Sequence, residues 1–328
     1  MSKKPIKIVI SDYENVLNRN LKFEIQQIQE KIPQAQVIIH PFKDRSSLYQ
    51  VLSDADGLLT AYLTMDKDFF DHCPSLKAIS VNATGYTCVD LEEAKKRNIS
   101  VCAIREYCTD EVADFTLALL LNLAKKIKLH EDNLIRKNIW NYELVGQVMA
   151  LKDSTLAIFG FGKIGQAVSV RAKAFGLNIL AVDPYLPKEV AEQLGLSLVT
   201  TQFAMDHADI ISNHMSVSDK NTAIFDENFF NGLKKKPIFL NLARGASLDE
   251  DALIKALDQG LVSAAGLDVL IDENPDTSIH PLFNRNNVII TPHAAFYSQA
   301  SMKKLQTISC NNLCYCLTGH LELTDHLL

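Results

Sequence analysis

The chain lacks the features that mark nucleic-acid-binding, membrane-spanning or exported proteins. Its 328 residues hold 33 Lys and Arg against 39 Asp and Glu, a formal net charge of -6, so no basic excess is available for nucleic acid. The nearest approach to a membrane span, residues 115–124, is far shorter than the roughly 18 apolar residues required. The early apolar run IKIVI has a strand's length and leads into polar residues rather than a cleavage site. These absences predict a cytoplasmic protein with small-molecule partners, without nucleic acid or a membrane.

The cysteines do not show the regular spacing of a disulfide framework either. There are seven, an odd number, scattered without regular spacing, which predicts free thiols in a reducing compartment. Cys310, Cys314 and Cys316 are close enough in sequence to suggest a metal site. They fall in an expected C-terminal helix, however, with no His-x-x-His or second CxxC to complete it, so no metal is predicted.

What the chain does contain is an alternation of short β-branched runs with helical stretches. This pattern predicts an α/β fold of parallel sheets covered by helices on both faces. Thr109 or Asp110 is expected to cap one helix. The expected helices are residues 90–97, 109–128, 163–175, 249–259 and a last one from near Ser298.

One strand, residues 155–159, runs into a glycine motif with the spacing GxGxxG and then into a helix. The first glycine permits a tight turn, the second lets the backbone approach a pyrophosphate, and the third lets helix and strand pack closely. The next strand ends in Asp183, whose carboxylate can accept both ribose hydroxyls and would repel a 2′-phosphate. The motif predicts NAD rather than NADP, with an ordinary turn as the weaker alternative. The predicted phosphate-binding residues are Gly160, Phe161, Gly162, Lys163, Ile164 and Gly165.

No linker rich in Pro, Gly or Ser separates domains, so any boundary is a crossing within ordered structure. About 100 residues of α/β pattern precede the dinucleotide motif, and about 35 follow the last strand. We therefore expect two domains, each a doubly wound parallel sheet. Residues 1–103 and 295–328 form a substrate domain, into which a Rossmann dinucleotide domain of residues 104–294 is inserted.

Three polar residues, Arg244, Glu273 and His293, follow later strands of the dinucleotide domain. Because ligands bind at the carboxyl ends of parallel strands, these side chains can converge although they are far apart in sequence. Arg244 can grip a carboxylate and a carbonyl, and His293 is suited to general acid and base chemistry near neutrality. Glu273, bonded to the other imidazole nitrogen, would fix its tautomer and stabilise the imidazolium. Each of the three residues alone has an ordinary structural explanation. Together they indicate oxidation of a hydroxy acid by a nicotinamide.

The segments NLARGASLDEDAL, GLDVLIDENP, TPHAAFYS and GFGKIGQAV resemble the signatures of the D-isomer-specific 2-hydroxyacid dehydrogenases. The resemblance covers essentially the whole chain and is nearest to the branch of the C-terminal-binding proteins and phosphoglycerate-dehydrogenase-like enzymes. It implies a flavodoxin-like domain beside a Rossmann domain, a homodimer, NAD as cofactor, and the roles above for the three residues.

The resemblance also implies binding roles that the residues alone do not reveal. Backbone amides of Thr84, Gly85 and Tyr86 would bind the substrate carboxylate. The remaining cofactor contacts it implies are Asp268 and the backbone around Ala243 for the nicotinamide carboxamide, His214 and Met215 near the adenosine, and, more weakly, Thr109 and Val112.

Two departures from the family pattern affect these expectations. The family has Glu-Pro where this chain has Glu273-Asn274-Pro275, which leaves Asp272 as an alternative partner for His293. It has a His-Cys-Pro-like stretch where this chain reads His214-Met215-Ser216, which weakens the adenosine assignment.

Two other functions remain open. Members of the C-terminal-binding branch are NAD(H)-responsive transcriptional corepressors that dock peptides, but this chain retains all three catalytic residues. Some relatives oxidise a one-carbon or inorganic anion instead. Nothing in the first 100 residues ranks lactate, glyoxylate, phosphoglycerate or a bulkier acid as substrate.

Overall fold

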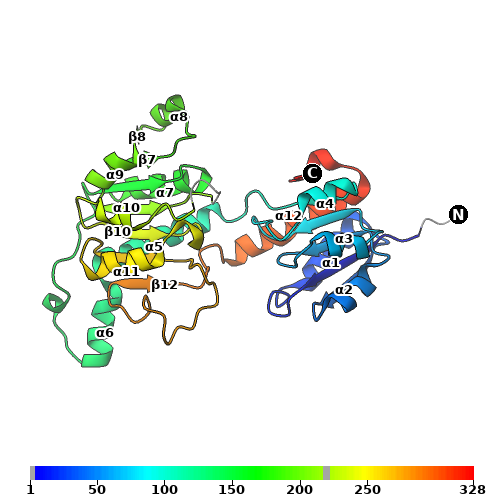
Figure 1. Cartoon of the computed structure of the whole chain (residues 1–328), viewed down its shortest axis with the longest axis horizontal. Helices are drawn as coiled ribbons and strands as arrows, with labels where there is room; N and C mark the ends of the chain where they lie inside the picture. Colours follow the sequence, from blue (N-terminus) through cyan, green and yellow to red (C-terminus); the bar gives the residue numbers. More distant parts are fainter. Residues whose placement is uncertain (1–3, 217–221) are drawn as a thin grey trace. The chain divides into compact units, whose positions relative to one another are not determined.

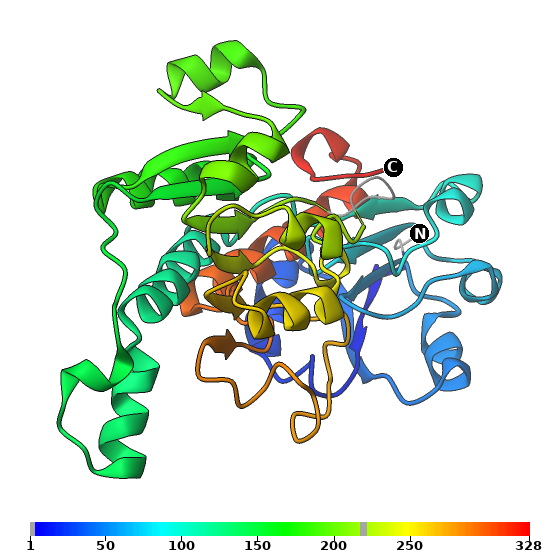
Figure 2. The ribbon, with the colours of Figure 1, turned by 60° about the vertical axis from the view of Figure 1, so that its left-hand side comes forward.

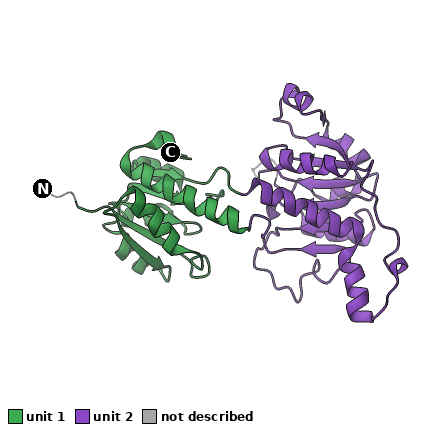
Figure 3. Cartoon of the chain, turned by 180° about the vertical axis from the view of Figure 1, so that it is seen from behind, with its two compact units in different colours: residues 1–107, 298–328 green, residues 108–297 purple. Residues whose placement is uncertain are grey.

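The computed structural model describes residues 4–216 and 222–328, which divide into two compact α/β units. Unit 1 comprises Met1–Tyr107 and Ser298–Leu328, and unit 2 comprises Cys108–Tyr297 (Figure 3). The chain thus crosses between units after Tyr107 and after Tyr297, whereas the sequence placed the crossings after residues 103 and 294.

Unit 1 is built on a five-stranded parallel sheet with the order β2-β1-β3-β4-β5. This is the flavodoxin-like doubly wound order, in which the order of the parallel strands reverses between β1 and β3. The strands are β1 (Lys7–Asp12), β2 (Gln36–Pro41), β3 (Gly57–Thr60), β4 (Ala78–Val81) and β5 (Ser100–Cys102).

Helices cover both faces of this sheet, because successive strand residues point to opposite sides and both sides are apolar. Val9 packs in a core with α2 (Arg45–Leu52), α3 (Lys67–His72) and α4 (Leu91–Lys96). Its neighbours Ile8 and Ile10 pack against α1 (Leu21–Lys31) and α12 (Gln299–Thr318), the C-terminal helix, which η3 (Leu321–Leu323) follows.

Unit 2 has a seven-stranded parallel sheet with the order β12-β11-β10-β9-β6-β7-β8. Numbered within the unit this is 7-6-5-4-1-2-3, the Rossmann order extended by one strand, with its reversal between β6 and β9. The fold class predicted from the sequence is therefore confirmed. The strands are β6 (Thr155–Phe159), β7 (Asn178–Val182), β8 (Ser197–Leu198), β9 (Ile210–Asn213), β10 (Ile238–Asn241), β11 (Ala264–Leu267) and β12 (Val288–Ile290).

The same alternation covers both faces of the second sheet. Leu156 and Ile158 face a core with α5 (Thr109–Lys125) and α7 (Lys163–Ala174). Ala157 and Phe159 face the opposite core, which holds α9 (Thr201–His207), α10 (Glu227–Asn231) and α11 (Glu250–Asp258). The other elements of the unit are α6 (Ile127–Lys137), α8 (Lys188–Gln193), η1 (Tyr142–Val145) and η2 (Gly245–Ser247) (Figure 1).

Two expectations about α5 were wrong. The single helix expected over 109–128 ends at Lys125, because Lys126 adopts a left-handed conformation with φ of 52° and α6 then begins. The N-cap is Cys108, without a side-chain cap bond, rather than Thr109 or Asp110. The carboxylate of Asp110 is instead bonded to Arg171 of α7 at 2.8 Å, so tertiary pairing takes the place of local capping.

No helix within residues 4–216 and 222–328 is long and apolar enough to cross a membrane. The same residues contain no group of three or more His, Cys, Asp or Glu side chains that could hold a metal ion. Of the three C-terminal cysteines, Cys310 and Cys314 are buried against the sheet of unit 1. Cys316 lies beside Cys102, with 3.4 Å between the two sulfurs. These side chains therefore pack the core as free thiols.

Candidate active site

The residues predicted for the site follow the ends of six adjacent strands in unit 2. Since these strands are parallel neighbours, their carboxyl ends lie along one edge of the sheet. The first three strands along this edge are followed by the catalytic candidates and by the proposed carboxamide contacts Ala243 and Asp268, and the other three by the remaining cofactor candidates of this edge. In spatial order the residues are His293 after β12, Glu273 after β11, Arg244 after β10, His214 after β9, Gly160 to Gly165 after β6 and Asp183 after β7.

His293 and Glu273 form a hydrogen-bonded pair. Nδ1 of His293 lies 2.9 Å from Oε1 of Glu273, and the two side chains are 37% and 53% exposed. Asp272 accepts from the backbone N–H of Asn274 at 2.9 Å, so the pairing of His293 falls on Glu273 despite the additional Asn274. With Nδ1 engaged, Nε2 is the ring atom left to exchange a proton with a substrate.

The backbone of His293 is held in an unusual conformation by Asp268. Its φ of 48° lies in the left-handed region, which a non-glycine residue adopts only when its surroundings impose it. The N–H of His293 donates to the carbonyl of Asp268 at 2.7 Å. The buried carboxylate of Asp268 accepts from the next two amides, Ala294 at 2.8 Å and Ala295 at 3.0 Å, and from the hydroxyl of Thr291 at 2.6 Å. Asp268 therefore organises the loop that presents His293.

A buried polar network sets the turn that carries Arg244. The amide of Asn213, at the end of β9, donates to Asn241 at 3.0 Å and to Ser247 at 2.7 Å. Asn241 and Ser247 in turn both donate to the carbonyl of Arg244, at 3.1 and 2.7 Å. The Arg244 side chain is exposed and donates through Nη1 to the carbonyl of Ala243 at 2.7 Å. A guanidinium has five N–H donors, so this bond leaves others to meet an anion.

The glycine after Arg244 allows two of these loops to touch. A Cβ added to Gly245 would lie 2.1 Å from the carbonyl oxygen of Leu270 and 2.5 Å from the backbone nitrogen of Ile271. Leu270 and Ile271 lead into Glu273, so the Arg244 turn and the Glu273 loop are in backbone contact. Any larger residue at 245 would force them apart.

The cofactor half has the geometry of a phosphate-binding turn. Gly160 has φ of 84°, and a Cβ there would meet the backbone nitrogen of Met215 at 2.6 Å. A Cβ on Gly165 would meet the carbonyl of Gly160 at 2.3 Å. Gly162 differs, since beyond its two chain neighbours no heavy atom of the described residues lies within 4 Å of its added Cβ. Packing thus explains two of the glycines, and the open space at the start of α7 fits a pyrophosphate against the helix N-terminus.

Asp183 and His214 flank this turn. The carboxylate of Asp183 accepts from the backbone N–H groups of Phe161 and Tyr185, each at 2.8 Å, and remains partly exposed, as a ribose contact requires. Burial lowers the pKa of His214 to about 3, so the ring is neutral, and its Nε2 lies 2.8 Å from the hydroxyl of Ser212.

The remaining predicted residues lie in both units. Thr109 begins α5, and Val112 is buried in the core beneath it. Thr84, Gly85 and Tyr86 belong to unit 1, in the exposed loop after β4. That loop starts at Asn82, whose side chain accepts from Ser309 of α12 at 2.9 Å.

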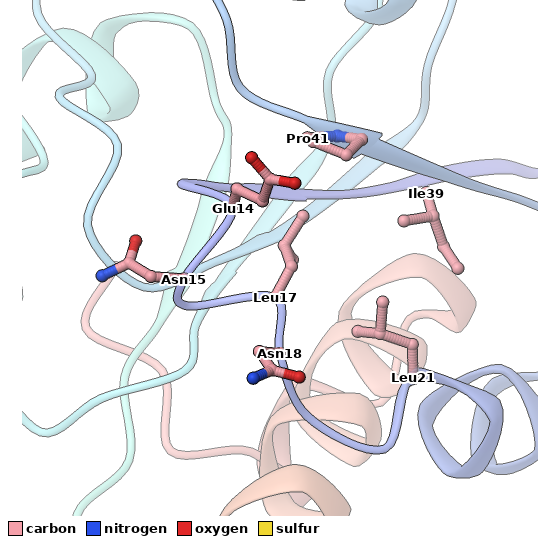
Figure 4. Close-up of a pocket in the computed structure, with 7 residues that line it drawn as sticks. All are labelled: Glu14, Asn15, Leu17, Asn18, Leu21, Ile39 and Pro41. Atoms are coloured by element: carbon pink, nitrogen blue, oxygen red, sulfur yellow. The ribbon is translucent and has the colours of Figure 1, made fainter.

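Unit 1 also contains a groove. It has a volume of about 770 Å³ and lies beside the carboxyl ends of β1 and β2. Figure 4 shows apolar Leu21 and Ile39 at one end and polar Asn15 and Asn18 toward the other. None of the predicted site residues lines it.

Sequence reasoning missed the residues that hold these loops, above all Asn213 and Asn241. Each is the last residue of a strand whose other positions are apolar or small, IISN for β9 and IFLN for β10. Both are fully buried. A buried amide at the end of a parallel strand was the available signal, because such a group must find partners in the neighbouring loops.

An extended Rossmann sheet with this glycine turn, the acid after β7 and a His–Glu pair at the same edge defines an NAD-dependent dehydrogenase. Residues 117–295 match the model of the D-isomer specific 2-hydroxyacid dehydrogenase, NAD binding domain. The chain belongs to the D-isomer-specific 2-hydroxyacid dehydrogenase family. It is therefore an NAD-dependent oxidoreductase.

Known relatives are similar over most of the chain. A glyoxylate reductase of Korarchaeum cryptofilum is 31% identical over 287 residues, covering 87% of this chain and 83% of the relative. A D-3-phosphoglycerate dehydrogenase of Methanocaldococcus jannaschii is 34% identical over 284 residues, covering 84% of this chain but 52% of the relative. The crystal structure of a D-lactate dehydrogenase from Aquifex aeolicus, complexed with NAD and lactic acid, has a TM-score of 0.83 and 26% identity and covers 96% of this chain and 97% of that one.

Proposed function

We propose that the protein interconverts a small D-2-hydroxy acid and the corresponding 2-oxo acid, with His293 as general acid and base, Glu273 orienting it and Arg244 binding the substrate. The observation that supports this most directly is the 2.9 Å bond between His293 and Glu273 on the edge that also carries Arg244. This pairing leaves one imidazole nitrogen for the substrate and opposes the developing charge with a carboxylate.

The proposed roles follow from the chemistry of each side chain. Arg244 offers paired donors to the substrate carboxylate and to the carbonyl oxygen that gains negative charge during reduction. His293 then gives the proton on Nε2 to that oxygen; in the reverse direction it takes the hydroxyl proton. When bound, NAD(H) accepts or supplies the hydride at the substrate carbon. By family resemblance, Thr84, Gly85 and Tyr86 of unit 1 bind the carboxylate through backbone amides.

The residues present fit NAD on the cofactor half of the edge. The turn from Gly160 to Gly165 would hold the pyrophosphate through the N-terminus of α7, and Asp183 the adenosine ribose. By resemblance, Asp268 and the backbone around Ala243 would hold the carboxamide, and His214, Met215 and Thr109 are further contacts. Three donors already occupy the carboxylate of Asp268, so at most one acceptor position is left for this contact.

The test is NADH oxidation with pyruvate, glyoxylate, hydroxypyruvate, phenylpyruvate and 3-phosphohydroxypyruvate. His293→Ala should lower turnover by about 100-fold or more while NADH still binds, because the proton donor alone is lost. His207→Ala is the matched control, since His207 is an exposed histidine on α9 outside the site. Unchanged turnover in His293→Ala would remove the assignment.

The alternative is an NAD(H)-sensing binding protein of the corepressor type. The relatives found are enzymes, and they do not favour it. If the wild-type protein bound NADH, turned over none of the five acids and bound short peptides, this alternative would replace the dehydrogenase.

We further propose that the protein is a cytoplasmic homodimer whose interface includes the arm of residues 127–148. This arm, α6 and the chain through η1, extends away from the rest of unit 2 in both ribbon views (Figure 2). Trp140 is 92% exposed. The other exposed apolar residues of the arm are Ile127, Leu134, Ile135, Ile139, Tyr142, Leu144 and Val148. So many exposed apolar side chains in one segment fit burial against a second copy of the chain.

Sedimentation tests this proposal. Replacing Trp140 and Tyr142 together by Ser should yield a monomer, because the two most exposed apolar side chains of the arm are lost. Tyr185→Ser, at an equally exposed tyrosine outside the arm, should leave the oligomer intact. A wild-type protein that sediments as a monomer would contradict the dimer.

A further inference from the structure

The loop that carries Glu273 is long and contains neither helix nor strand. It runs from Asp268, after β11, to Asn287, before β12. A loop of this length needs side-chain anchors to keep one conformation. The side chain of Glu273 is 53% exposed, so burial does not fix its position.

Glu250 anchors both arms of this loop at once. It is the first residue of α11, and its side chain is only 15% exposed. One carboxylate oxygen accepts from the backbone N–H of Ile271 at 2.7 Å. The other lies 3.2 Å from Nε2 of His280. Ile271 and His280 lie on either side of Glu273 in sequence, so one carboxylate joins the segments before and after it.

The tautomer of His280 determines which group donates in its hydrogen bond with Glu250. Its Nδ1 accepts from the backbone N–H of Leu282 at 3.3 Å, so the proton is on Nε2 and is donated to Glu250. Leu282 is buried in the core of unit 2, which fixes that end of the loop. Both oxygens of Glu250 are thus engaged with the loop.

Glu250 also belongs to the segment that presents Arg244. From Arg244 the chain passes through η2 and the N-cap Asp249, whose side chain accepts from Ala252, directly into Glu250. The contact of Gly245 with Leu270 and Ile271 lies beside the bond from Glu250 to Ile271. The Glu273 loop is therefore attached to the same rigid turn that carries the substrate-binding arginine.

We infer that Glu250 and His280 form a second carboxylate–histidine pair that positions Glu273 against His293. They are positioning residues, since their side-chain hydrogen bonds among the described residues go to Ile271, to Leu282 and to each other. The inference rests on the proposed catalytic roles of Glu273 and His293.

The first test is steady-state kinetics. Glu250→Ala should lower kcat by about 10- to 100-fold, since misplacing a catalytic group by about 1 Å has an effect of this order. The affinity for NADH should change little, because the proposed pyrophosphate and ribose contacts follow β6 and β7 rather than β10 and β11. Glu250→Gln keeps an oxygen for Ile271 but sets an amide N–H against the Nε2–H of His280, so its kcat should fall between those of Glu250→Ala and wild type. Asp251→Ala is the matched control, being the next acid in the same helical turn.

A double-mutant cycle separates positioning from general destabilisation. If Glu250 acts through Glu273, adding Glu250→Ala to Glu273→Gln should change kcat by less than about twofold. A further loss as large as that in the wild-type background would overturn the inference. An equal loss in Asp251→Ala would do the same.

Hydrogen exchange gives a readout that does not depend on turnover. Amides of residues 269–283 should exchange at least about tenfold faster in Glu250→Ala than in wild type or Asp251→Ala, because the loop loses both anchors. Unchanged exchange would refute the anchoring of the loop by Glu250 even if the dehydrogenase assignment stands. Faster exchange in a protein that turns over no 2-oxo acid would support this anchoring and reject the proposed function.

Discussion

The two units each bury a carboxylate at the carboxyl edge of their sheet, and the two are held in the same way. Asp12, at the end of β1, accepts from the backbone of Tyr13, Ala61 and Tyr62 and from the hydroxyl of Thr60. Asp268, after β11, accepts from two backbone amides and from one threonine hydroxyl. Within the described residues neither carboxyl group has a Lys or Arg partner, so N–H and O–H donors satisfy its oxygens.

The difference lies in what the bonded loop carries. Asp12 joins the ends of β1 and β3, whereas Asp268 imposes the left-handed backbone of His293. The same device thus has a structural effect in unit 1 and a proposed catalytic effect in unit 2. A buried acid at a strand end is therefore not by itself evidence of catalysis; the loop that it organises decides its role.

The largest expected effect comes from replacing each acid by asparagine. Asp12→Asn and Asp268→Asn each set an amide N–H against a backbone N–H, so each should lower the free energy of unfolding by about 1 to 3 kcal/mol. Only Asp268→Asn should also lower kcat, by about 100-fold, because His293 loses its imposed geometry. Denaturant unfolding and NADH oxidation measure the two effects.

This pair of variants tests the comparison directly. Equal losses of kcat in both variants would show that stability alone controls activity. A normal kcat in Asp268→Asn would show that His293 keeps its place without that loop. NADH affinity should be measured for Asp268→Asn, since the resemblance also places Asp268 near the carboxamide.

A second comparison concerns a glycine at each edge. A Cβ on Gly245 in unit 2 would lie 2.1 Å from a backbone oxygen. A Cβ on Gly85 in unit 1 would have no heavy atom of the described residues within 4 Å beyond its two chain neighbours. Gly245→Ala should therefore lower the free energy of unfolding by about 2 kcal/mol and kcat about tenfold. Gly85→Ala should leave the free energy of unfolding within about 0.5 kcal/mol of wild type.

The contrary results are equally informative. A fully active Gly245→Ala protein would show that the loops carrying Arg244 and Glu273 need no close contact. A Gly85→Ala protein with normal stability and a raised KM for the 2-oxo acid would support the substrate role proposed for that loop.

Most of the fold could be predicted from the sequence, but few of the contacts that hold the site residues in place could be. Strands such as IKIVI and the GxGxxG turn are local patterns, so the two parallel sheets could be predicted. The cap of α5 was predicted wrongly because Asp110 is bonded to Arg171 on another helix. The contacts of Glu250 with Ile271 and His280 join segments 21 and 30 residues away. They depend on which backbone groups meet in space, which periodicity does not encode.

The smallest expected effect concerns Asp183, a third acid at a strand end, which is partly exposed where Asp268 is buried. It should select the cofactor, but one of its oxygens also accepts from Phe161 of the glycine turn. Asp183→Ala would disturb that turn as well as remove the charge. Asp183→Asn keeps an acceptor for Phe161, so NADH affinity should fall only about tenfold while NADPH affinity rises by a smaller factor, because repulsion of the 2′-phosphate is relieved. Fluorescence titration of both cofactors measures this, and an unchanged ratio of the two affinities would mean that Asp183 supports the turn without reading the ribose.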